Sequence, residues 1–220
     1  MRLFLLALAR FTAGVALTGG LLFWSAGGFD YWNAWLLMGV LFLPMLGGGV
    51  WMAARRPDLL RQRMRTREHP SQHRVILLSG LLFVAGFVLS GLGWRWQWGL
   101  VPRWVSLAAA GVLLAAYLLY GEVLRENAYL SRSVEVQPGQ KVVDSGLYGI
   151  VRHPMYSATI LLFLDIPLVL GSLLAFVLFL LYPGLLIGRI RQEEKLLSCQ
   201  LPGYADYMQR VRWRLLPGVW

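Results

Sequence analysis

The sequence is short of charged residues and of cysteine. Only 15% of its 220 residues are charged, whereas a soluble domain has about 25%. The single cysteine, Cys199, excludes a disulfide framework and a cysteine-rich metal site. Histidines number three, and His69 and His73 are spaced i,i+4. Because Pro70 lies between them and no third ligand is evident, we expect no metal site.

Acidic residues are also few. Eleven Asp and Glu stand against 21 Lys and Arg, so the formal net charge is +10. Hydrophobic residues are abundant instead, at 57%. This composition excludes a disordered chain and is typical of a membrane protein. In a soluble protein the basic excess would suggest nucleic-acid binding, but in so apolar a chain it indicates loops that face an anionic membrane surface.

Long apolar runs predict the membrane helices. A transmembrane helix needs about 20 mostly apolar residues. Four stretches qualify, namely residues 3–24, 31–53, 75–93 and 104–124. The first run, preceded by Arg2, also resembles a signal peptide. Because Arg10 interrupts it and it is long for such a peptide, we expect a retained helix.

A fifth apolar region, residues 155–188, is too long for one span. Asp165 and Pro167 lie inside it, and proline kinks a helix by removing a backbone donor. We therefore predict two helices, 155–166 and 168–188, that enter the membrane and return to the same side. The expected fold is an all-α membrane protein with four transmembrane helices, a kinked C-terminal helical hairpin and a cytoplasmic cofactor-binding segment.

The basic residues gather on one side of this predicted arrangement. Eighteen of the 21 fall in the loops and tails of one face, whereas only Arg95 and Arg103 fall on the other. The positive-inside rule then predicts a multi-pass protein of the inner or plasma membrane with both termini in the cytoplasm. The outer loop is flanked, as in an aromatic belt, by Trp94, Trp96, Trp98 and Trp104. Nucleic acid is not expected as a partner.

The chain divides into two parts. Residues 1–124 contain the four membrane helices, and residues 125–220 contain every motif that suits chemistry. The linker 125–153 is long for a connection between helices, and long ordered loops are often functional. We expect a helix that continues to about Leu130, followed by a small hairpin with its turn at Pro138-Gly139.

The densest polar segment runs from Asp144 to Tyr156. Arg152 and His153 directly precede Pro154, and proline is favoured as the first residue of a helix. A helix N-terminus beside an arginine and a histidine suits a carboxylate or a phosphate. The same residues suit the anchoring of lipid headgroups equally well, and both interpretations stay open.

A second polar cluster follows the last apolar run. Arg189 and Glu193 are i,i+4 neighbours, so they can pair or hold a ligand between them, and Glu194 is adjacent. The plainer interpretation is a solvated helix end. Farther on, Tyr204 and Tyr207 share helical spacing with Val211, which predicts a packed stripe. Aromatic side chains also cover adenine or a sulfonium cation.

Together these motifs resemble the isoprenylcysteine carboxyl methyltransferase family. Its members are integral membrane methyltransferases that use S-adenosylmethionine and are related to phospholipid N-methyltransferases. The resemblance covers about residues 120–217. It rests on Gly146-Leu-Tyr148, Arg152-His-Pro-Met-Tyr156, Arg189 with Glu193-Glu194, Tyr204 with Tyr207, and Leu216-Pro217. The front half agrees in its membrane helices and in the stretch Arg56–Leu60, and the spacing before Tyr204 is one residue shorter than usual.

The resemblance implies a cytoplasmic-side pocket for S-adenosylmethionine beneath residues 144–156 and the C-terminal helix. It carries cofactor contacts onto Tyr148, His153, Pro154 and Tyr156, and onto Glu193 or Glu194. With the residues singled out by their own chemistry, the candidate cofactor-binding set is Tyr148, Arg152, His153, Pro154, Tyr156, Glu194, Tyr204 and Tyr207. The candidate catalytic residues are Arg189, Glu193 and Glu194.

The expected activity is methyl transfer from S-adenosylmethionine to a lipidic or prenylcysteine-like carboxylate drawn from the bilayer. A carboxylate is already ionised at neutral pH, so catalysis would rest on orientation and on shielding from water. Arg189 would orient the acceptor, and Glu193 or Glu194 would hold Arg189 or the cofactor's ammonium. Three alternatives stay open. They are a phospholipid amine or small thiol acceptor with Glu193, Glu194 or His153 as base, an NADPH enzyme like the sterol reductases, and a non-catalytic membrane scaffold.

Overall fold

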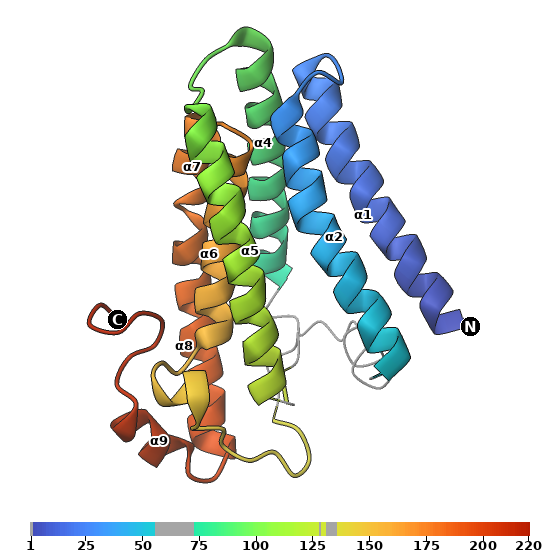
Figure 1. Ribbon diagram of the computed structural model, residues 1–220. Coiled ribbons are helices and arrows are strands. Elements are labelled where there is room, and N and C mark those ends of the chain that lie inside the picture. The colour runs from blue at the N-terminus through green and yellow to red at the C-terminus, as the bar shows by residue number, and fades with distance from the viewer. Residues whose placement is uncertain (1, 56–72, 128, 131–135) are drawn as a thin grey trace.

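The computed structural model describes residues 2–55, 73–127, 129–130 and 136–220 (Figure 1). Its helices are α1 (Arg2–Ala26), α2 (Trp32–Arg55), α4 (His73–Trp96), α5 (Arg103–Glu126), η2 (Gly146–Gly149, a 3-10 helix), α6 (Pro154–Val169), α7 (Leu173–Phe179), α8 (Tyr182–Gln200) and α9 (Tyr204–Arg210). No strand occurs among these residues. The all-α prediction is confirmed, and each of the four predicted membrane helices is present.

Five segments are long and apolar enough to cross a membrane. They are Leu5–Ala26, Trp32–Arg55, Val75–Trp96, Arg103–Glu126 and the combined α7–α8 segment Leu173–Gln200. Large apolar side chains cover their outer surface; Leu118, for example, is 78% exposed. Such a surface suits hydrocarbon and not water. The protein is therefore a multi-pass membrane protein.

Small residues allow the central helices to pack closely. α5 carries Ala109, Ala110 and Ala116 on its buried face, and these pack in one cluster with Leu162 and Ile166 of α6. Because alanine has little side chain, two helix backbones can approach each other closely. α5 and α6 lie together at the centre of the bundle, while α1 and α2 lie to one side of them (Figure 1).

The C-terminal hairpin bends later than the sequence predicted. α6 runs through Pro167 to Val169, and the break lies at Leu170–Ser172. Proline cannot donate the hydrogen bond that residue 167 would make to the carbonyl of residue 163, yet the helix continues past it for two residues. Gly171 turns the chain with a φ of 75°, and the Ser172 hydroxyl accepts a hydrogen bond from Ala175 N to cap α7. A second interruption, before Tyr182, separates α7 from α8.

The linker after α5 also differs from its prediction. α5 ends at Glu126 and not at Leu130, because Asn127 is extended and its side chain accepts a hydrogen bond from Tyr129 N. The predicted turn at Pro138-Gly139 is confirmed. The second half of the expected hairpin, residues 141–143, is not a strand, and residues 134–135 of the first half lie outside the described residues.

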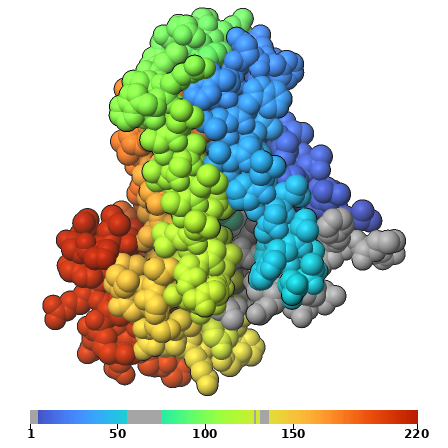
Figure 2. Space-filling view, viewed as in Figure 1, coloured from blue at the N-terminus to red at the C-terminus, as the bar shows by residue number. Residues whose placement is uncertain are grey.

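One end of the bundle collects the segments that carry the motifs. The C-terminal ends of α5 and α8, the start of α6, η2, α9 and the tail all lie at this end, which we call the motif end (Figure 2). The basic loop 56–72 of the sequence prediction, including Arg56–Leu60 and His69, lies outside the described residues.

Candidate functional site

A cavity of about 90 Å³ lies at the motif end. Its walls combine aromatic, cationic and anionic side chains. They include Tyr129, Tyr148, Tyr156, Tyr204, Tyr207, Lys141, Arg152, His153, Arg189 and Glu193. The linker 127–143 closes one side of the cavity with Asn127, Leu130, Gln140 and Val142.

Glu194 is the centre of a buried ion cluster beside this cavity. The residue is 5% exposed, and its Oε1 lies 2.7 Å from Arg152 Nε and 3.2 Å from His153 Nε2. Its other oxygen accepts a hydrogen bond of 2.8 Å from Arg214 Nε. A carboxylate with so many donors is strongly held in place. Glu194 does not line the cavity, so it acts on the cavity walls through Arg152 and His153.

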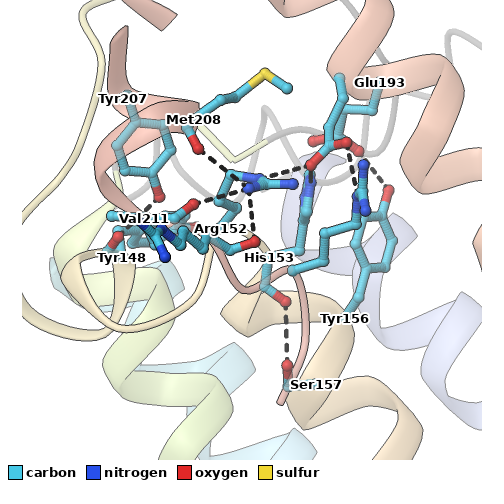
Figure 3. Close-up of polar contacts among 12 residues, drawn as sticks. Tyr148, Arg152, His153, Tyr156, Ser157, Glu193, Tyr207, Met208 and Val211 are labelled. Carbon is cyan, nitrogen blue, oxygen red and sulfur yellow. Dashed lines mark hydrogen bonds and ion pairs between the residues drawn. The ribbon is translucent and has the colours of Figure 1, made fainter. Parts of the chain in front are cut away.

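Arg152 ties the start of α6 to the C-terminal tail. Its Nη1 donates to the carbonyls of Val211 at 2.7 Å and Arg212 at 2.9 Å, and more weakly to Met208 (Figure 3). The backbone N–H groups of Arg152 and His153 also donate to tail carbonyls, at 2.9 Å each. These bonds hold the segment that directly precedes α6 against the tail.

Tyr156 connects the two charged motifs inside the cavity. Arg189 Nε donates to the Tyr156 hydroxyl at 2.9 Å, and this hydroxyl donates to Glu193 Oε2 at 2.6 Å. The Arg189 guanidinium also lies over the Tyr156 ring, 5.8 Å from its centroid. Tyr156 thus sets the positions of both charged side chains, which face the cavity from one side of α8.

The tyrosines of α9 both pack and line the cavity. Tyr204 and Tyr207 form a cluster with Leu201 and Val211, which confirms the predicted stripe. The Tyr207 hydroxyl donates to the backbone carbonyl of Tyr148 at 2.8 Å. Burial raises the pKa of Tyr204 and of Tyr207 above its usual value, so both phenols stay protonated as donors.

A tight turn places Tyr148 in the cavity wall. Gly146 has a φ of 55°, a conformation that favours glycine. The next amide, Leu147 N, donates to the Glu126 carboxylate at 2.9 Å. A Cβ on Gly146 would collide with that same carboxylate. Glycine is favoured at this turn, because its backbone angle is left-handed and an added Cβ would force the Glu126 carboxylate to move.

The structure brings most of the predicted site residues into one cavity wall, with two exceptions. Pro154 begins α6 but does not line the cavity, and Glu194 lies behind its wall. The sequence analysis missed Arg214 as a partner of Glu194. It also missed Asn127, Gln140 and Lys141 of the linker, which carry no periodic pattern or motif. Only the fold of the tail and the linker brings these residues to the site.

Comparison with known proteins finds a match to one family over part of the chain. Residues 105–199 match the isoprenylcysteine carboxyl methyltransferase (ICMT) family. The match confirms the resemblance drawn from the motifs, and it extends from α5 through most of α8. This segment is somewhat less than half of the chain.

Two relatives share a part of the chain. Uncharacterized protein YpbQ of Bacillus subtilis (strain 168) is 32% identical over 96 residues, which are 43% of this chain and 56% of YpbQ. Delta(14)-sterol reductase TM7SF2 of Mus musculus is 30% identical over 91 residues, which are 40% of this chain and 22% of that protein. The chain therefore spans about half of the first relative and about a fifth of the second.

Proposed function

We propose that this chain, whose residues 105–199 belong to the ICMT family, is a membrane methyltransferase that uses S-adenosylmethionine. One observation carries the proposal. Within the family segment and the tail that folds onto it, a single cavity combines a carboxylate, several cations and four buried tyrosines. Residues 125–220 would then form the catalytic part, and residues 1–124 the membrane helices that support it.

The groups in the cavity fit the parts of S-adenosylmethionine. Glu193 suits the ammonium of its amino-acid end, and Lys141 and His153 suit the carboxylate. The tyrosine faces suit adenine and the sulfonium cation. When bound, this cofactor supplies a methyl group on a positively charged sulfur.

The residues of the chain would act by positioning. Arg189 would orient the carboxylate of the acceptor, and the hydroxyl of Tyr156 holds the Arg189 side chain in place. Glu194 would act indirectly, because it holds Arg152 and His153 and does not reach the cavity. Preorganised charges in a site shielded from water favour a displacement reaction without a strong base.

The acceptor is proposed to be lipidic, with a prenylcysteine-like carboxylate. The cavity is lined by residues near the end of α5, the start of α6 and the last turns of α8, so a lipid-anchored group would reach it without leaving the bilayer. A phospholipid amine or a thiol would instead need to lose a proton, for which Glu193 or His153 is placed. The excess of basic residues at the motif end supports a cytoplasmic location for this site.

A binding and turnover experiment tests the proposal. Purified wild-type protein should gain thermal stability with S-adenosylhomocysteine and transfer labelled methyl groups into membrane extracts. Arg189→Ala should keep the thermal shift but lose turnover by at least roughly a hundredfold. Arg191→Ala, an exposed position on the same helix, is the matched control and should keep both. Equal turnover by Arg189→Ala would refute the role of Arg189.

A second candidate function follows from the sterol reductase relative. The match to Delta(14)-sterol reductase TM7SF2 covers 40% of this chain, so a nicotinamide cofactor in the same cavity is the competing hypothesis. Thermal stabilisation by NADPH and none by S-adenosylhomocysteine would favour this reductase. A non-catalytic scaffold predicts no stabilisation by either compound.

A further inference from the structure

A second cavity lies at the opposite end of the bundle. It has a volume of about 310 Å³ and is lined by Trp32, Asn33, Trp94, Leu100, Val101, Arg103 and Gly171. α5 begins at Arg103 and ends at the candidate site, and its 24 residues span about 36 Å. The two cavities therefore lie near opposite faces of a bilayer. We call the second one the far cavity.

Hydrogen bonds between loops hold the rim of the far cavity in shape. Val101 N donates to the Gly171 carbonyl at 2.9 Å, and Leu173 N donates to the Gly99 carbonyl at 2.8 Å. The Tyr31 hydroxyl donates to the Leu170 carbonyl at 2.6 Å, and its ring stacks on Trp94. These contacts join the start of α2, the end of α4 and the turn between α6 and α7, so the cavity is built by the fold.

The far cavity has a cation without an anionic partner. The Arg103 guanidinium lies over the Trp32 ring, 5.0 Å from its centroid. Within the described part of the chain no carboxylate pairs with Arg103. Arg103 is also one of only two basic residues that the sequence places on this side of the membrane. Arg103 is exposed and lines the cavity, so its guanidinium is open to an anion that enters there.

The far cavity also has an acceptor without a donor among the described residues. Asn33 is 3% exposed, and its Nδ2 donates to Ser106 Oγ at 3.0 Å and to the Val169 carbonyl at 2.8 Å. These two bonds fix the amide orientation, so Oδ1 is the free atom. No described residue donates to Asn33 Oδ1. Asn33 lines the cavity, so a ligand in the cavity that supplies a donor would complete this acceptor.

We propose that the far cavity binds the headgroup of a phospholipid. The group attached to the phosphate of this lipid carries a hydrogen-bond donor. The phosphate would pair with Arg103, and an ammonium or hydroxyl group would donate to Asn33 Oδ1 beside the Trp94 ring. Exposed indoles around this end, such as Trp96 and Trp104 at 57% and 71% exposed, suit the level of lipid headgroups. The site is independent of the proposed methyltransferase activity.

Native mass spectrometry of the full chain in detergent tests this inference. Phosphatidylethanolamine and phosphatidylglycerol should bind, while phosphatidylcholine, whose headgroup has a phosphate but no donor, should bind several-fold more weakly. Arg103→Ala should weaken phosphatidylethanolamine binding roughly tenfold. The matched control is Arg95→Ala, an exposed arginine at the same end that does not line the cavity, and it should bind as the wild type does.

Three results would overturn the inference. The first is that Arg103→Ala and the wild type bind phosphatidylethanolamine equally well. The second is that the wild type binds phosphatidylcholine and phosphatidylethanolamine equally well. The third is that inorganic phosphate competes with the lipid at equal concentration. The last result would mark a site for a free anion. Melting temperatures of the two arginine variants without lipid, expected to match the wild type, separate loss of binding from loss of fold.

Discussion

The motif end and the middle of the bundle each bury one acidic residue, and the two surroundings differ completely. Glu194, 5% exposed, has three partners, namely Arg152, His153 and Arg214 of the tail. Asp165 of α6 is 7% exposed, and its Oδ2 is buried without a hydrogen-bond partner in the described residues. Burial by itself therefore does not mark a functional acid. The partners show that Glu194 organises the motif end and that Asp165 organises none of the described residues.

Glu194→Ala tests this difference most strongly. The substitution leaves Arg152 buried without its anion, which typically destabilises a protein by about 3–5 kcal/mol. We expect that loss in the free energy of unfolding, measured by SDS titration in mixed micelles, together with loss of the thermal shift by S-adenosylhomocysteine. Glu193→Gln, its neighbour in the cavity wall, should keep the stability and lose only the ligand effect. A Glu194→Ala protein as stable as the wild type would contradict the organising role.

Gly146→Ala tests the turn that carries Tyr148 at the same end. The left-handed backbone and the collision with Glu126 should together cost roughly 1–3 kcal/mol of stability. The unfolding titration measures this cost. Gly139→Ala is the control: it has a similar φ of 73° but no atom within 4 Å of the added Cβ, so its cost should be smaller. Equal costs would show that Glu126 moves away freely.

Arg214→Ala removes one cation of the cluster and keeps its anion. The Arg214 side chain is 30% exposed, so solvent weakens its pairing with Glu194. We expect a loss of about 1 kcal/mol or less in the same titration. A loss as large as that of Glu194→Ala would mean that Arg214, and not Glu194, holds the cluster together.

Asp165→Asn should have the smallest effect. The amide has nearly the same shape as the carboxyl and carries no charge, and Oδ2 has no described partner to lose. We expect a change within about 0.5 kcal/mol, or a small gain, in the free energy of unfolding. Methyl transfer should also be unchanged. A large loss in either measurement would give Asp165 a role and remove the contrast with Glu194.

Much of the fold follows from one-dimensional patterns. Apolar runs of about 20 residues predict membrane helices because a bilayer demands helical segments of that length. The start of α6 at Pro154 is equally local, because proline suits the first turn of a helix. The break in the hairpin was predicted at Pro167 and lies at Gly171, because a proline in the last turn is tolerated and a left-handed glycine ends the helix.

The site was predictable only in its motifs. Tyr148, Arg152, His153, Tyr156, Arg189 and Glu193 share a cavity wall as the motifs suggested. Nothing in the order of residues distinguished Glu193 from Glu194. The two differ because successive positions on a helix point about 100° apart, so one faces the cavity and the other faces the tail.

The sequence alone therefore determined that this is a membrane protein and where its first four long helices lie. These properties depend on composition and on the length of apolar runs. The tertiary structure alone decided which acid faces the cavity, which carbonyls satisfy Arg152, and that Arg103 and Asn33 line a second cavity. Such properties depend on contacts between residues far apart in the chain, which only the packing of helices and tail creates.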